Sequence, residues 1–212
     1  MNTLYKNEQS GRSMVEMLGV LALIGVLSRG GISGYSRAMS KYRVNKTLDQ
    51  ISMLVMNIRS LFSASVDYEN LTSRLAIQMG IIPRDMLPPG DDETNASSIR
   101  NAYQGSVFVG NGADVRQFFV EYTGLTQEAC VAIATADWGS QAGSGLVSIA
   151  VGPSSKDKES MGVETASPGS PDTVFTLDPT AAHPIPISVY HASTYCSNSA
   201  DDTGNTIRWT YY

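Results

Sequence analysis

Hydrophobic and polar positions follow two different patterns along the chain, and the change between them falls near residue 65. From Met14 to Leu27 the sequence is almost continuously apolar, with Glu16 as its one charged residue. Apolar residues then recur at spacings of three and four, at Val44, Leu48, Ile51, Val55, Ile58 and Phe62. That spacing is typical of one face of an α-helix, and no proline occurs before Pro83. We therefore predict one long N-terminal helix with a hydrophobic first half and an amphipathic second half.

The rest of the chain has the pattern of a globular head. Short runs typical of strands begin at Ser106, Gln117, Gly145, Val174 and Thr206. Helices are expected near Leu71–Met79 and from an N-cap at Thr126 through about Trp138. This order predicts an α+β fold in which a mainly antiparallel β-sheet packs on the long helix.

The apolar run would be a marginal membrane anchor. Its fourteen residues, Met14 to Leu27, form about 21 Å of helix, against roughly 30 Å of hydrocarbon in a bilayer. Extending the run to Ile32 brings in Arg29, whose charge would have to reach the membrane surface. Gly30 and Gly34 weaken the helix, although their spacing permits close approach of another helix. The acid at Glu16 adds a further cost, roughly 3 kcal/mol for a mid-helix position in lipid, and is by default a functional residue.

Charge is distributed unevenly along the chain. The segment from Arg12 to Ser65 carries a net charge of +5, and the segment from Val66 to Tyr212 carries −10. These charges are consistent either with solvated surface or with an electrostatic partnership, for example between the basic section Arg37–Lys46 and acidic heads. An acidic head argues against intrinsic nucleic-acid binding.

The two cysteines, Cys130 and Cys196, both lie in the head. They form either a disulfide in an oxidising compartment or two unrelated thiols in a cytosolic protein. Basic residues that follow the apolar run would place the head in the cytoplasm by charge counting. The cysteine pair and the polar first eleven residues argue for export instead. The membrane segment ahead of the cysteines also favours export, and therefore the disulfide.

The start of the chain carries a specific signature. The first eleven residues, MNTLYKNEQSG, are polar and lack the apolar core of a secretory signal peptide. Gly11 is followed by four residues and then by Glu16 inside an apolar helix, which resembles the prepilin signature of type IV pilins. The stretch GRSMVEMLGVLALIGVLS is most similar to the type IVb branch and its conjugative-plasmid relatives. The cysteine pair resembles the C-terminal disulfide-bounded region of that family.

The resemblance implies a role for each matching residue. Gly11 would end a leader peptide that prepilin peptidase removes, and Arg12 would become the N-terminus and be N-methylated. Glu16 would pair with the N-terminal amine of a neighbouring subunit, which offsets its desolvation only after docking. The expected segments are a leader at 1–11, a membrane and filament-core helix at 12–34, its amphipathic continuation at 35–65, and a head at 66–212.

The implied function is that of a structural subunit, inserted in the inner membrane as a precursor and then polymerised into an extracellular pilus. Its partners would be identical subunits, prepilin peptidase, the assembly machinery of the inner membrane and lipid. Two alternatives stay open within this architecture, a minor pilin and a pseudopilin of type II secretion. A third, of another class, is a membrane-anchored adhesion module that does not polymerise. Arg12 departs from the phenylalanine or methionine of many members, and Arg29 interrupts a stretch that is usually apolar.

No catalytic signature accompanies these features. The sequence lacks a G-x-S-x-G frame and a phosphate-binding glycine loop. His183 and His191 together with the cysteines match no compact zinc site, and Asp91, Asp92 and Glu93 are more typical of a solvated turn than of a calcium site. We therefore expect no enzyme activity, no cofactor and no metal.

Overall fold

The computed structural model describes residues 14–65, 67–88, 98–139, 144–154, 173–197 and 203–212. The chain divides into two compact units, Met1–Lys41 and Tyr42–Tyr212. The described part of the first unit is called the front, and the second unit is called the head.

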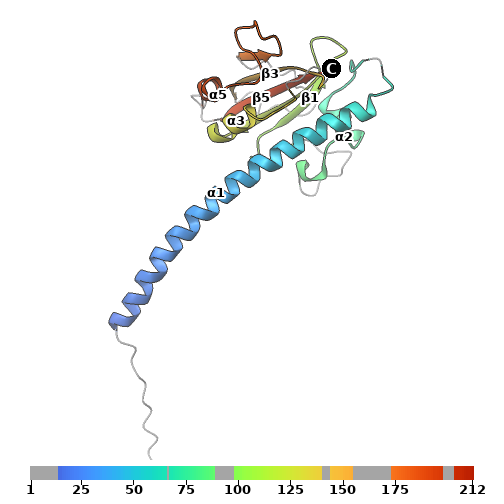
Figure 1. Cartoon of the computed structure of the whole chain (residues 1–212). Coiled ribbons are helices and arrows are strands. Elements are labelled where there is room, and N and C mark those ends of the chain that lie inside the picture. Colours follow the sequence, from blue (N-terminus) through green and yellow to red (C-terminus); the bar gives the residue numbers. More distant parts are fainter. Residues whose placement is uncertain (1–13, 66, 89–97, 140–143, 155–172, 198–202) are drawn as a thin grey trace, which may run out of the picture. The chain divides into compact units, whose positions relative to one another are not determined.

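Helix α1 runs from Met14 to Leu61 and confirms the prediction of one long helix. Its part within the head is amphipathic, because Ile51, Leu54 and Ile58 recur on one face and are fully buried. Figure 1 shows this part of α1 lying along the sheet. Burial of each leucine or isoleucine side chain contributes roughly 1.5–3 kcal/mol to folding stability, so this face holds α1 firmly against the rest of the head.

The head contains a five-stranded sheet with the order β1-β2-β5-β3-β4. Its strands are β1 (Val107–Asn111), β2 (Phe118–Leu125), β3 (Leu146–Pro153), β4 (Thr173–Thr176) and β5 (Asn205–Tyr211). Every neighbouring pair is antiparallel, as predicted. The last strand in the sequence, β5, lies in the middle of the sheet, between β2 and β3.

Alternation along β5 decides which side chains face α1. Ile207, Trp209 and Tyr211 are buried, and the ring of Tyr211 lies under the Arg59 guanidinium of α1 at 5.0 Å. Trp209 also packs edge-on against Tyr122 of β2, with ring centroids 5.9 Å apart. The core of the head therefore lies between α1 and this face of the sheet.

Short helices complete the described part of the head: α2 (Ser73–Gln78), the 3-10 helix η1 (Arg84–Met86), α3 (Gln127–Ala134) and α5 (Val189–Tyr195). The Thr126 side chain accepts a hydrogen bond from the Ala129 amide, which confirms the predicted N-cap of α3. Helix α5 was not predicted, because its seven residues, three of them polar, are too few to establish a helical period.

The prediction that α3 extends to about Trp138 is wrong, since the helix ends at Ala134. The Trp138 indole donates to the Ile133 carbonyl at 2.8 Å, which is the acceptor that another helical turn would use. Gly139, at φ +78°, then turns the chain away. Trp138 nevertheless reaches the core, with its ring 4.9 Å from that of Trp209.

Candidate functional site

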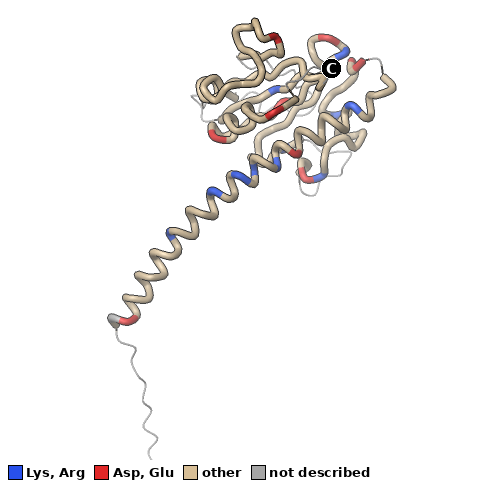
Figure 2. Tube along the Cα trace, viewed as in Figure 1, with Lys and Arg blue, Asp and Glu red and all other residues tan. Residues whose placement is uncertain are grey.

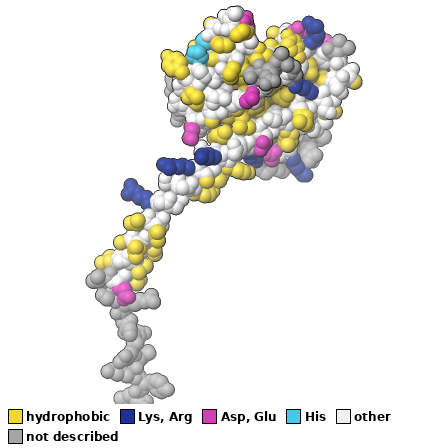
Figure 3. Space-filling model, in the orientation of Figure 1, with side chains coloured by type: hydrophobic (Ala, Val, Ile, Leu, Met, Phe, Trp, Pro, Cys, Tyr) yellow, Lys and Arg dark blue, Asp and Glu magenta, His cyan; other side chains and the backbone are white. Residues whose placement is uncertain are grey.

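The front of α1 is apolar and exposed. All the large apolar side chains from Met17 to Ile32 are exposed to solvent, and they point to every side of the helix. Hydrophobic side chains cover this part of the molecule in Figure 3. By length and composition the helix is able to cross a membrane. A helix that is apolar all round needs either lipid or other protein chains around it.

Glu16 lies in the first turn of α1, and its side chain is exposed. The positive end of the helix dipole stabilises a carboxylate at this position, by roughly 0.3–1 kcal/mol. A position at the helix end is also less costly in lipid than the centre of a span. Among the described residues, no hydrogen bond or salt bridge involves Glu16, so the acid is available to another molecule.

The predicted cleavage site, Gly11 with Arg12, lies outside the described residues. Arg29 is on α1 and is exposed. It is the first of a row of basic residues along the helix (Figure 2).

The glycines of the front make no close contact with the described chain. A Cβ atom added at any of them would meet nothing within 4 Å: Gly19, Gly25, Gly30, Gly31 and Gly34. Their small size is therefore not required by packing within this chain. It leaves room for the close approach of another helix.

A second apolar face of α1 lies within the head. Tyr42, Met53 and Met56 are exposed and lie on the same side of the helix, with Met56 70% exposed. This exposed stripe lies opposite the buried face that contains Ile51. Asn45 and Asp49 lie on the same side between Tyr42 and Met53, so the exposed apolar residues form a short patch at Met53 and Met56.

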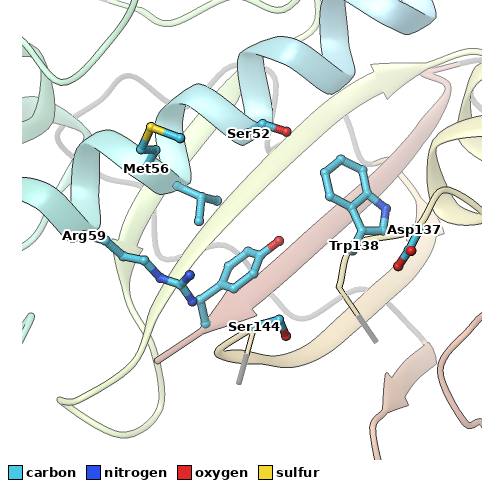
Figure 4. A pocket seen from close by; sticks show the side chains of 8 residues that line it. Ser52, Met56, Arg59, Asp137, Trp138 and Ser144 are labelled. Carbon is cyan, nitrogen blue, oxygen red and sulfur yellow. The ribbon is translucent and has the colours of Figure 1, made fainter. Parts of the chain in front are cut away.

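A groove of about 350 Å³ flanks this stripe within the head. One wall is formed by Ser52, Val55, Met56 and Arg59 of α1, and the rest by Asp137, Trp138, Ser144 and Tyr211. In Figure 4 Arg59 enters at one end, and Asp137 and Trp138 lie at the other. The groove is therefore lined mainly by apolar surface together with two serines, with a cation at one end and an acid at the other.

Arg59 is incompletely satisfied in this groove. Its Nη2 atom is buried and has no hydrogen-bond partner within the described part of the chain. Burial raises the pKa of the Tyr211 phenol to about 12 although the Arg59 charge opposes this, so the ring under the guanidinium stays neutral at physiological pH. Gly145, at φ +72°, leaves the space that the guanidinium occupies, because a Cβ atom there would collide with Nη2.

Part of the basic section contacts its own head. Lys46 forms a salt bridge with Asp85 at 3.0 Å, and Gln50 donates a hydrogen bond to the same carboxylate at 2.9 Å. Partial burial raises the pKa of Asp85, but the hydrogen bonds from Lys46 and Gln50 and the Lys46 charge outweigh it, so the pKa lies below its ordinary value. Arg43 lies over the Tyr103 ring at 5.9 Å. Arg37 and Lys41 are exposed and remain available to a partner.

Cys130 and Cys196 form a disulfide, with Cα atoms 5.7 Å apart. The bridge joins α3 to the C-cap of α5 and closes a 66-residue separation. Both cysteines are fully buried. The disulfide is therefore an internal staple of the head, and its sulfurs are not free to bind zinc.

The two histidines lie together but do not form a metal centre with other described ligands. The rings of His183 and His191 are 5.8 Å apart, and both pack near Phe175. Within the described ranges, no group of three metal-ligating side chains occurs.

Known proteins resemble this chain in sequence and in fold. The family model described as "PilS N terminal" matches residues 41–211. The major structural subunit of bundle-forming pilus from Escherichia coli O127:H6 (strain E2348/69 / EPEC) is 26% identical over 139 residues, which cover 65% of this chain and 69% of that protein. The protein of the same name from Escherichia coli O111:H- matches equally well.

Two solved structures are also similar. The type IV b pilin from Salmonella typhi has a TM-score of 0.49 and 21% identity, over 79% of this chain and 98% of that one. TcpA, a type IV pilin from Vibrio cholerae El Tor biotype, has a TM-score of 0.49 and 14% identity, over 81% of this chain and 99% of that one.

Proposed function

Because this chain belongs to the PilS family and is a type IV pilin, we propose that it is the major structural subunit of a type IVb-like pilus. The relatives in Escherichia coli are described as major structural subunits, which supports the bulk role over that of a minor pilin or a pseudopilin. The precursor is held in the inner membrane by the front of α1, and the mature subunits form an extracellular filament.

One observation carries the proposal: from Met17 to Leu27 the front has exposed apolar side chains on every side of the helix, and its one acid is in the first turn. In the filament, the fronts of neighbouring subunits bundle and replace lipid around the apolar side chains. Removal of residues 1–11 frees the amine of Arg12, which is then N-methylated. The carboxylate of Glu16 on one subunit binds the N-terminal amine of the next, so the acid is neutralised only when a subunit has docked.

The front must also leave the bilayer during assembly. Its short apolar run, Arg29 and its five glycines make it a weak anchor, which lowers the cost of extraction by the assembly machinery. The unfilled space beside those glycines suits close packing of neighbouring helices in the fibre.

The test replaces the acid in full-length chains. Glu16→Ala is expected to insert in the membrane and fold its head, but to lower the yield of filaments at least about tenfold, because the intersubunit ion pair is lost. Asp178→Ala is the control, since it removes an exposed acid of the head whose carboxylate already accepts hydrogen bonds from Thr180 of its own chain. Normal filament yield from Glu16→Ala would remove the pairing.

Mass spectrometry of the mature N-terminus tests the processing. A chain that starts at Arg12 and carries one methyl group is expected. A mature protein that retains residues 1–11 would favour an anchored adhesion module that never polymerises.

A further inference from the structure

The groove beside α1 has a polar requirement that its own described chain leaves unmet. Nη2 of Arg59 is buried without a partner among the described residues, although a guanidinium carries five donors and is costly to bury unpaired. Asp137, at the far end of the groove, accepts a hydrogen bond from the Gly139 amide at 3.0 Å and forms no salt bridge with Arg59. Within the described part of the chain, no acceptor is therefore placed to bind Nη2 of Arg59.

The groove is also continuous with the exposed stripe of α1. Met56 belongs to both, and Met53 lies one turn before it. A surface that joins two exposed methionines to a partly enclosed cation offers both apolar area and one directional contact, as binding hot spots do.

We infer that this groove docks the head of a second copy of the chain, which presents an exposed carboxylate to Arg59. The inference rests on the proposed function, since the filament brings copies together at high local concentration. The contact deepens that function by adding a head-to-head interface to the contact between the fronts.

Charge favours a second copy as the occupant. The segment from Val66 onward carries a net charge of −10. Glu69 and Glu128 are exposed acids with no salt bridge within the described residues. A groove on one copy and an acid elsewhere on the next form a heterologous contact, which is compatible with the open helical assembly of a filament and does not give a two-fold dimer.

The first experiment places a photo-reactive phenylalanine analogue at Met56 in full-length chains and irradiates intact fibres. We expect an adduct of twice the subunit mass, in which the peptide joined to Met56 comes from the acidic head of another copy. A matched probe at Leu61, exposed on α1 but outside the groove, reports labelling by proximity alone. Fibres in which the Met56 probe yields no interchain adduct, or an adduct with a different protein, would overturn the docking.

The second experiment tests the charge while leaving the core intact. Ser52 is exposed at the groove wall, and its hydroxyl donates to the Leu48 carbonyl of its own helix. Ser52→Glu should lower the Met56 adduct yield at least about threefold through repulsion of the incoming acid, and Ser52→Lys should raise it. Ser60→Glu and Ser60→Lys, outside the groove, should change it little. Equal effects of the two Ser52 variants on the adduct yield would contradict docking of a carboxylate. A purely structural role of Ser52 would not make the yield depend on the sign of the introduced charge.

The outcomes separate the two proposals. Fibres that form normally without the interchain adduct overturn the docking and leave the proposed function standing. An unmodified chain that forms no fibres overturns the proposed function, and the docking with it.

Discussion

The front and the head use hydrophobic residues in opposite ways. In the head, Ile51, Leu54 and Trp209 are fully buried, and every described strand contributes to one core. In the front, residues of the same kind, such as Leu23 and Leu27, are more than half exposed. The head is therefore stable by its own contacts, whereas the front depends on molecules that surround it. Changes in the head should alter folding, and changes in the front should alter membrane retention and assembly.

The largest expected effect on the head comes from its disulfide. Replacing both Cys130 and Cys196 by alanine should lower the free energy of unfolding of the head by about 4 kcal/mol, because the unfolded chain is no longer constrained by a loop of this length. Thermal or denaturant unfolding followed by tryptophan fluorescence measures it. Free thiols on both cysteines in secreted fibres would contradict the disulfide.

A buried ion pair in the sheet should have the next largest effect. Arg208 of β5 donates from Nε to the Glu121 carboxylate at 2.7 Å, and the Glu121 side chain is fully buried. Glu121→Leu should cost about 3 kcal/mol, because Arg208 then lacks this carboxylate. The double variant Glu121→Leu with Arg208→Met should recover much of that loss in a denaturant titration. Equal unfolding midpoints for the single variant and the unmodified chain would show that the pair contributes nothing.

Low pH should weaken the contact of Lys46 and Gln50 on α1 with Asp85 on η1, and the loss of stability should be smaller. The lowered pKa of Asp85 means that its carboxylate stabilises the fold above about pH 4 and that this contribution is lost as pH falls through the lowered pKa. Because the group is partly exposed, the effect should be about 0.5 kcal/mol. Unfolding curves of the unmodified chain and of Asp85→Asn should differ at about pH 6 and converge at about pH 2. A constant difference across that range would exclude the ionised carboxylate as its source.

A substitution in the front should have the smallest effect on the stability of the head, and it tests most directly whether the two units are independent. Leu23→Ser in the front should change the unfolding of the head by less than about 0.5 kcal/mol, since its side chain makes no contribution to the core. The same change should weaken retention in membrane fractions, because it places a hydroxyl in the apolar run. A large loss of head stability would show that the two units are energetically coupled.

The long helix, all five described strands and the N-cap at Thr126 were predictable from the sequence, because hydrophobic periodicity and capping chemistry are local. Helix α5 was missed, since its seven residues span only about two turns and are too few to establish a helical period. The end of α3 was placed too late, because the Ile133 carbonyl is taken by the Trp138 indole, a contact that periodicity does not encode.

The candidate sites divide in the same way. Glu16 was found from sequence because a charge in an apolar run stands out. The groove was not, since Arg59 meets Tyr211 and Gly145 only after strands distant in sequence have paired. The interaction of Lys46 with Asp85 was likewise hidden, so part of the basic section proved to be intramolecular.

The central place of β5 has a consequence for how the protein is made. The strands synthesised earlier form two separate antiparallel pairs, β1 with β2 and β3 with β4, and each pair joins the other only through β5. A chain in which β5 has not yet been synthesised therefore carries two strand pairs without the strand that joins them. The described sheet therefore becomes continuous only after β5 has formed, and a chain truncated before Asn205 should keep two strand pairs that do not join.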